Sequence, residues 1–209
     1  MLKSFLRGGM PGGKIRAPWP IYFIRHGQTD WNAERRFQGH ADIPLNALGQ
    51  KQALRNGKIL AQEIRNLNNV SFYSSPLIRA RQTLEIIREQ LGLPKQRYMI
   101  DDRLIEIDLG LWNGKTPEEI NAEDPGAFER RNEDKWNFVL PDGESYAGAA
   151  SRTRDFLTHL NGPTVITGHG ASGRLLRGYL CGLKREDVPH LPAPQDVIFK
   201  LHHRKETKI

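Results

Sequence analysis

Two short segments place a histidine directly after a run of apolar residues. The first run is IYFI at 21–24, followed by Arg25 and His26, and the second is TVIT at 164–167, followed closely by His169. Each run is rich in β-branched or aromatic residues and is followed by a turn signal, as a buried strand is. An imidazole can act as a nucleophile or exchange a proton near neutral pH. Both histidines are therefore candidate catalytic groups at strand ends.

Two further segments bring charged groups to predicted strand ends. VSFY at 70–73 leads into a helical pattern that carries Arg79 and Arg81 near its start, where backbone amides also favour an anion. YMI at 98–100 is followed by Glu106 and Asp108. A single histidine or arginine in such a place is more often structural than catalytic. Four segments that deliver such groups to one edge of a sheet make coincidence a poor explanation.

The histidines, arginines and carboxylates at these strand ends could together bind either a metal ion or a phosphate group. Two histidines and a carboxylate could bind zinc or iron. The arginines argue against this, because a permanently charged guanidinium repels a divalent cation and its planar fork suits phosphate oxygens. We therefore expect a phosphate group as the ligand and no metal.

The spacing of apolar residues predicts the elements that hold these groups. Helical patterns at 48–66 and 79–92 alternate with the strands, and DVIFKL at 196–201 is a candidate fifth strand. This alternation predicts an α/β fold with a mostly parallel sheet covered by helices on both faces, in which ligands bind at the carboxyl ends of the strands. Residues 113–147 mix charged residues, prolines and aromatics without a clear strand. This composition predicts a helical excursion over that edge of the sheet, which is either a lid or a solvated connection.

Length and charge indicate one domain with basic ends. The chain has 209 residues and a net charge of +7, of which residues 1–20 carry +4 and residues 202–209 carry +2. The nearly balanced body gives little support to a nucleic-acid surface. We expect a flexible basic N-terminal tail at 1–18, a single domain at 19–201 and a basic C-terminal tail at 202–209.

Cysteine content and hydropathy bear on the compartment. The single cysteine, Cys181, cannot form an internal disulfide, which is compatible with a reducing compartment. No apolar run approaches the roughly 20 residues that span a bilayer, and the Gly/Pro-rich start favours a flexible tail over a transit peptide. The expected protein is cytoplasmic, with no membrane partner. Its oligomeric state is left open, a homodimer included.

Five motifs together resemble the histidine phosphatase superfamily, whose best-known branch is the cofactor-dependent phosphoglycerate mutases. They are, in chain order, RHGQTDWN, FQGHADIPLNALGQKQA, SSPLIRARQT, EIDLGLWNG and GHG, and they run from about Ile21 to about Leu183. RHG or GHG alone would match many unrelated chains, but the ordered set is specific. The resemblance implies a three-layer α/β/α fold and leaves both tails unexplained.

The resemblance also implies roles in catalysis. His26 would attack phosphorus to give a phosphohistidine, and Arg25, Arg79 and His169 would hold the phosphoryl oxygens. Adjacent positive charge disfavours protonation of an imidazole, so the two arginines should keep His26 a free nucleophile. Glu106 would be the general acid, a role that needs a raised pKa. Asp108 could compete for that role but fits the acid position less well.

A further group would line the phosphate or leaving-group side of the pocket. By resemblance these are Thr29, Asn32, Gln38, Gly39 and Gly170. A structural interpretation stays open, in which Thr29 and Asn32 cap a helix and Gln38-Gly39 is only a turn. Trp112 is expected to pack rather than to contact substrate.

Two features of the sequence bear on whether the protein is a hydrolase or a mutase. EIDLGLWNG resembles the phosphatase-like branch, and only 63 positions separate Glu106 from His169, which favours hydrolysis of a small phosphorylated metabolite without a cofactor. The alternative is a phosphoglycerate mutase, in which Arg130 and Arg131 would bind a carboxylate. Those arginines could instead belong to a solvated helix with compensating acids. A noncatalytic phosphate-binding or protein-binding module is a third, weaker hypothesis, because no expected catalytic position is missing.

Overall fold

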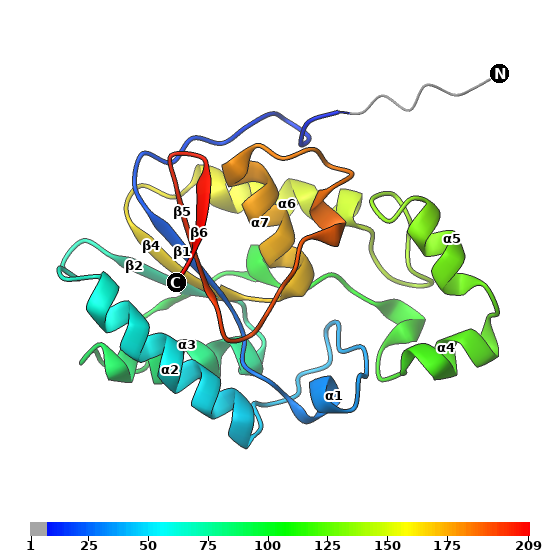
Figure 1. The fold of residues 1–209 in the computed structure, drawn as a ribbon, viewed down its shortest axis with the longest axis horizontal. Helices are drawn as coiled ribbons and strands as arrows, with labels where there is room; N and C mark the ends of the chain where they lie inside the picture. The colour runs from blue at the N-terminus through cyan, green and yellow to red at the C-terminus, as the bar shows by residue number, and fades with distance from the viewer. Residues whose placement is uncertain (1–7) are drawn as a thin grey trace.

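A single mixed sheet organises the protein. The computed structural model describes residues 8–209 and has the strand order β3-β2-β4-β1-β5-β6 (Figure 1). The strands are β1 (Ile21–Arg25), β2 (Ser71–Ser74), β3 (Met99–Ile100), β4 (Thr164–Gly168), β5 (Ile198–His202) and β6 (Lys205–Lys208). The first four in chain order pair in parallel, whereas β5 and β6 are antiparallel. The predicted mostly parallel sheet is confirmed.

Helices cover both faces of this sheet and complete the predicted three layers. One face carries α2 (Ala47–Glu63) and α3 (Ile78–Gln90), and the other carries α6 (Tyr146–Thr158) and α7 (Gly170–Cys181) (Figure 1). Shorter elements are α1 (Asp30–Ala33), α4 (Pro117–Glu123) and α5 (Ala127–Glu133), with the 3-10 turns η1 (Asp102–Leu104), η2 (Gly110–Trp112) and η3 (Val188–His190). None of the helices within 8–209 is both long and apolar enough to cross a membrane.

The first four residues of β1 are apolar or aromatic and buried because each face of the strand packs against helices. Ile21 and Phe23 join the core under α6 and α7, and Tyr22 and Ile24 join the core under α2 and α3. Helix α7 approaches β1 closely at Gly173, where a Cβ atom would lie 2.2 Å from the ring of Phe23. This packing fixes the ends of β1 and α7 relative to each other.

The register of β1 and β4 brings their carboxyl ends together. Arg25 pairs with Gly168 at the last position of both strands. The backbone N–H of His26 then donates to the carbonyl of Gly168 at 2.9 Å. His26 and His169 consequently start from adjacent points on the sheet edge.

The C-terminal segment differs from its prediction. Residues 202–209 do not form a free basic tail: Lys205–Lys208 are strand β6, which pairs with β5, and Ile209 exchanges backbone hydrogen bonds with Ile198 at 3.0 and 3.2 Å. The folded unit therefore continues past residue 201.

The N-terminal prediction falls partly on residues 1–7, which lie outside the described residues. Residues 8–18 lie against the body, because Met10 is buried in the α7 core and Gly9 bridges to Lys184. Arg154 also donates to the carbonyl of Gly12 at 3.0 Å. The described part of the expected tail is an arm of the folded unit.

The excursion at 113–147 extends the core under α6 and α7, to which it contributes Ile120, Ala127 and Trp136. Its helices α4 and α5 project at one end of the molecule (Figure 1). Trp112 is buried beneath them, with its ring centroid 5.0 Å from that of Phe128. The predicted packing role of Trp112 is confirmed, and movement of the excursion as a lid stays a prediction.

Candidate active site

A cavity of about 190 Å³ opens at the carboxyl ends of the parallel strands. Its lining joins residues from the β1–α2 connection, α3, the segment after β3, α5, α6 and α7. The lining residues are Arg25, His26, Asn32, Arg36, Phe37, Gln38, Gly39, Arg79, Glu106, Ile107, Leu109, Arg131, Tyr146, Gly170, Ala171 and Arg174. Six basic side chains thus surround one carboxylate, which makes the cavity a receptor for anions.

His26 is held as a neutral imidazole. It is 3% exposed, and its Nδ1 lies 2.7 Å from the carbonyl of Gly27, to which a ring N–H can donate. A neutral ring with its proton on Nδ1 keeps a lone pair on Nε2. Burial, reinforced by the charges of Arg25 and Arg79, holds the pKa of His26 well below its usual value. The predicted effect of the arginines is confirmed in direction, although burial is the larger cause.

Arg79 is fixed by backbone carbonyls rather than by an acid. Its two terminal nitrogens donate to the carbonyls of Ala41 at 2.6 Å and Gly39 at 2.7 Å. Gly39 has a φ of +44°, a conformation that favours glycine, so its turn presents this carbonyl. Arg25 is held similarly by the carbonyl of Ala193 at 2.7 Å. Burial lowers the pKa of each guanidinium to about 10, which leaves both cationic at neutral pH.

His169 is oriented by Ser75. The ring is fully buried, and its Nε2 lies 2.7 Å from the Ser75 hydroxyl. That hydroxyl also accepts from the N–H of Leu77 at 3.4 Å, so donating its own proton to Nε2 satisfies both groups. Burial, with Arg79, His26 and Arg25, holds the pKa of His169 well below its usual value. A neutral ring bonded in this way carries its proton on Nδ1.

The remaining donors around His26 share a property. Nδ1 of His169 and the Nε atoms of Arg25 and Arg79 are buried and have no hydrogen-bond partner among the described residues. The ring centroids of His26 and His169 are 5.2 Å apart. Buried donors normally have partners, so these atoms point to an anionic ligand beside His26.

Glu106 enters the cavity at the start of α7. Its carboxylate accepts the backbone N–H groups of Ala171 at 3.0 Å and Ser172 at 3.1 Å, and that of Ile107 at 3.0 Å. Asp108 is not part of the lining, and its carboxylate accepts from the N–H of Gly110 at 2.9 Å. Glu106 is therefore the carboxylate placed to exchange a proton with a ligand.

The predicted substrate-contact residues divide into two groups. Asn32, Gln38, Gly39 and Gly170 line the cavity, whereas Thr29 is not in the lining. Thr29 caps α1, because its hydroxyl accepts from the N–H of Asn32 at 3.2 Å and its own N–H donates to the Asn32 side chain at 3.2 Å. The structural alternative is thus confirmed for Thr29 as a cap, and Asn32 both caps the helix and faces the cavity.

Gly170 lies where three side chains of the site converge. A Cβ atom there would lie 3.5 Å from Glu106 Oε2, 3.5 Å from Arg174 Nη1 and 4.0 Å from Arg25 Nε. Arg174 was not predicted, although it lies four residues after Gly170 and therefore on the same face of α7. Tyr146, Arg36 and Phe37 are further lining residues that the sequence patterns did not indicate.

A family model decides the identity. The model of the histidine phosphatase superfamily, branch 1, matches residues 21–208. The chain belongs to the histidine phosphatase superfamily. Within residues 8–209 of this histidine phosphatase, no three His, Cys, Asp or Glu side chains cluster so that they could hold a metal ion.

Relatives of this histidine phosphatase include both hydrolases and mutases. It is 32% identical over 199 residues to phosphoserine phosphatase 1 of Hydrogenobacter thermophilus, covering 87% of this chain and 91% of that one. It is 32% identical to a probable phosphoglycerate mutase GpmB of Erwinia tasmaniensis, covering 88% and 85%. The structure of a mycobacterial glucosyl-3-phosphoglycerate phosphatase complexed with VO3 matches with a TM-score of 0.77 and 29% identity, covering 87% and 90%.

The outer wall of the cavity, formed by Arg131 and Arg174, carries positive charge that no carboxylate of the described residues pairs with. Arg131 is half-buried, and its guanidinium carbon lies 5.7 Å from the ring centroid of Trp112. Arg174 donates to the hydroxyl of Tyr146 at 3.2 Å and to the carbonyl of Leu191 at 2.6 Å. Neither guanidinium forms an ion pair with a carboxylate in the part of the chain that the structure describes. Burial, with Arg131 and Arg174, also lowers the pKa of Lys135 to about 8.

Proposed function

We propose that this histidine phosphatase hydrolyses phosphomonoesters of small metabolites through a phosphohistidine at His26. The observation that supports this proposal is the set of buried donors without partners, from Arg25, Arg79 and His169, around a neutral imidazole. Such donors stabilise the equatorial oxygens of a transferring phosphoryl group.

The proposed reaction has two steps. In the first, Nε2 of His26 forms a bond to phosphorus, the bond from phosphorus to the ester oxygen breaks, and Glu106 gives its proton to the leaving alcohol. In the second, the Glu106 carboxylate takes a proton from water, whose oxygen attacks phosphorus while the P–N bond breaks. Inorganic phosphate leaves, and His26 and Glu106 return to their starting states. The same side chain serves as acid and then as base.

The outer wall supports a narrower class of substrate. In this proposal Arg25 and Arg79 bind the phosphoryl oxygens. Arg131 and Arg174 then remain in the same cavity as cations without an anionic partner. Half-buried cations of this kind favour a ligand with a second anionic group. Phosphoserine, named in one relative, and phosphoglycerate, named in others, both carry a carboxylate. We propose that the preferred substrates carry a carboxylate beside the phosphate ester.

Release of inorganic phosphate tests the general proposal. We expect turnover of p-nitrophenyl phosphate and of 3-phosphoglycerate with EDTA present, because His26 and Glu106 need no metal for either step. The mutase alternative, supported by the GpmB relatives, predicts formation of 2-phosphoglycerate that depends on a bisphosphoglycerate primer and releases little phosphate. No turnover of either kind across a panel of phosphate esters would favour the noncatalytic module. The cytoplasmic location and a homodimer stay predictions.

Replacing Arg131 with glutamine tests the substrate class. The kcat/KM for O-phosphoserine should fall by about 10- to 100-fold, the loss expected for a hydrogen bond between charged groups. O-phosphoethanolamine has the same ester group without the carboxylate, so its kcat/KM should change by less than about 3-fold. A steady-state comparison of the two esters measures this difference.

The neighbouring arginine provides a matched control. Arg130 is exposed and is paired with the carboxylate of Asp124 at 2.5 Å. Arg130→Gln should therefore leave the preference for O-phosphoserine unchanged. Equal losses for both esters in Arg131→Gln, or equal effects of the two substitutions, would remove the carboxylate proposal and leave the hydrolysis proposal standing.

A further inference from the structure

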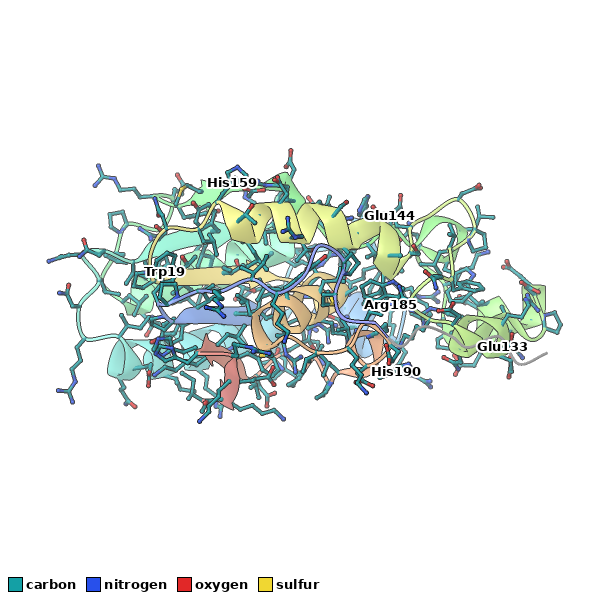
Figure 2. The ribbon with its side chains drawn as sticks, turned by 90° about the horizontal axis from the view of Figure 1, so that it is seen from above. Trp19, Glu133, Glu144, His159, Arg185 and His190 are labelled. Atoms are coloured by element: carbon teal, nitrogen blue, oxygen red, sulfur yellow. The ribbon has the colours of Figure 1, made fainter. Side chains whose placement is uncertain are left out.

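A second cavity lies at the other end of the sheet from the excursion. It encloses about 470 Å³ between the N-terminal arm, the C-terminal end of α7 and the turn that joins β5 to β6. Its lining residues are Arg16, Ala17, Pro18, Leu180, Leu201, His202, His203 and Arg204. Trp19, which follows the arm, and Glu133 of α5 lie at opposite ends of the molecule in Figure 2. Leu201 of this lining pairs with Ile21 at the amino end of β1, whereas Arg25 and His26 lie at its carboxyl end, so the two cavities lie at opposite ends of the strands.

The floor and the rim of this cavity differ in polarity. Leu180 and Leu201 are buried residues of the α7 core, and with Ala17 and Pro18 they give the floor apolar atoms. The charged and titratable residues of the lining are two arginines and two histidines, with no carboxylate among them. Small-molecule sites commonly combine a mostly apolar lining with a few convergent polar groups, in volumes of roughly 300–1,000 Å³.

The acidic group closest in sequence to this rim is already neutralised. Glu206 on β6 accepts from Arg177 at 2.7 Å and 2.9 Å in a bidentate pair. On the other side, Lys14 and Arg204 both approach Gly182 at the end of α7, within 3.4 Å and 2.7 Å of where its Cβ would lie. A cation at a helix C-terminus offsets the helix dipole, a role that Arg204 can fill while its guanidinium stays at the rim of the cavity. The helix dipole does not account for Arg16 or for the apolar floor beneath the cationic rim.

The turn holds its side chains against the cavity at a conformational cost. His203 and Arg204 are the two residues between the paired ends of β5 and β6, and their φ angles are +49° and +65°. A two-residue hairpin with both angles positive normally takes Asn or Gly, so bulky side chains there are strained. The strand end is also tied to the arm, because Nε2 of His202 donates to the carbonyl of Pro18 at 3.1 Å. The cavity is thus preformed by contacts between distant segments.

We propose that this second cavity binds a small organic anion with an apolar, aromatic body and one carboxylate group. The apolar floor takes the body, and the guanidinium groups of Arg16 and Arg204 bind the carboxylate in bidentate contact. Because the two cavities lie at opposite ends of the sheet, such an anion binds independently of a phosphate at His26. This inference does not depend on the proposed catalytic function.

Calorimetric titration of the full chain with 1-naphthoate tests this proposal. We expect one site per chain with a Kd at or below about 1 mM, in the presence or absence of saturating inorganic phosphate. Two further titrants separate the contributions: 1-naphthalenemethanol keeps the aromatic body without the charge, and acetate keeps the charge without the body. Each should bind at least about 10-fold more weakly.

Substitution of Arg204 by glycine gives a signature that a purely structural role would not produce. Glycine adopts a φ of +65° without strain, which offsets the loss of the cation at the end of α7, so the variant should keep a Tm close to that of the wild type, yet its Kd for 1-naphthoate should increase about 10-fold. Arg16→Gln should weaken binding similarly, and Arg97→Gln, an exposed arginine outside the lining, should not. The proposal is overturned if 1-naphthoate does not bind, if phosphate displaces it, or if Arg204→Gly binds it as tightly as the wild type.

Discussion

Replacing His26 with alanine is expected to lower kcat/KM for every phosphomonoester by at least about 10⁴-fold, because the group that forms the bond to phosphorus is removed. The cationic groups that surround it remain, since Arg25 and Arg79 are held by backbone carbonyls rather than by His26. Binding of inorganic phosphate should consequently survive in the variant while turnover is lost. Phosphate release measured beside calorimetric phosphate binding separates these two effects.

Chemical trapping adds a direct readout of the nucleophile. Rapid mixing of the wild type with a radiolabelled substrate, followed by quenching in base, should retain label on the protein as an acid-labile phosphoramidate, and the His26→Ala variant should retain none. His159→Ala is the matched control, because this exposed histidine contacts Arg103 and Asp155 far along α6 from the cavity. Activity above about 1% of wild type in His26→Ala, or label that persists in it, would assign the nucleophile elsewhere.

Much of the fold could be predicted because the sheet is built from apolar runs bounded by turn signals. The strand at 164–167 is uniformly buried and β-branched since both of its faces are covered, and its end carries the polar GHG motif. Strand β6 was not predicted because it lacks such an apolar run and such a turn signal. Its sequence KETK has no apolar alternation, because it pairs only at the sheet edge, and the His203-Arg204 turn lacks the Asn or Gly that usually indicates a hairpin.

The catalytic half of the site could be predicted because its residues follow strand ends. SSPLIRARQT contains two arginines, of which the resemblance selects Arg79, and the structure supplies the physical reason: Arg79 is 1% exposed in the site, whereas Arg81 is exposed near the hydroxyl of Tyr98. Residues two apart on a helix point in nearly opposite directions, so they cannot share a site. Identifying the inward one requires the packing face of α3, which is set by tertiary contacts.

The substrate half of the site was harder to predict, because its residues come from helix interiors and from the excursion. Arg131 lies in the mixed-charge run ERRNEDK, where neighbouring acids suggest compensation. Compensation holds for Arg130, which pairs with Asp124, but not for Arg131, which lies beside Trp112 at the cavity. Two adjacent residues of one short helix thus lie in different environments, and the sequence pattern alone does not distinguish them.

Glu106→Gln is expected to produce an effect that depends on the leaving group. Glutamine keeps the size of the side chain, and with its carbonyl oxygen in the place of Oε1 it can still accept the N–H groups of Ala171 and Ser172, so the cavity should keep its shape. It cannot give a proton to the ester oxygen. Formation of the phosphoenzyme from an alkyl phosphate should therefore slow by about 10²- to 10³-fold. Formation from p-nitrophenyl phosphate should slow by less than about 10-fold, because p-nitrophenolate leaves without protonation.

Hydrolysis of the phosphoenzyme, the second step of the proposed reaction, gives a further readout of the same substitution. The same substitution removes the base that activates water, so the phosphoenzyme should accumulate when it is formed quickly. Glu106→Gln should give a burst of p-nitrophenol equal to the enzyme concentration, followed by slow turnover, and no burst with an alkyl phosphate. Asp108→Asn is the matched control, since Asp108 bonds the backbone of Gly110 outside the cavity lining and should keep wild-type kinetics with both esters. If Glu106→Gln slowed both esters equally in a single turnover, or if Asp108→Asn showed the leaving-group dependence instead, the proton donor would not be Glu106.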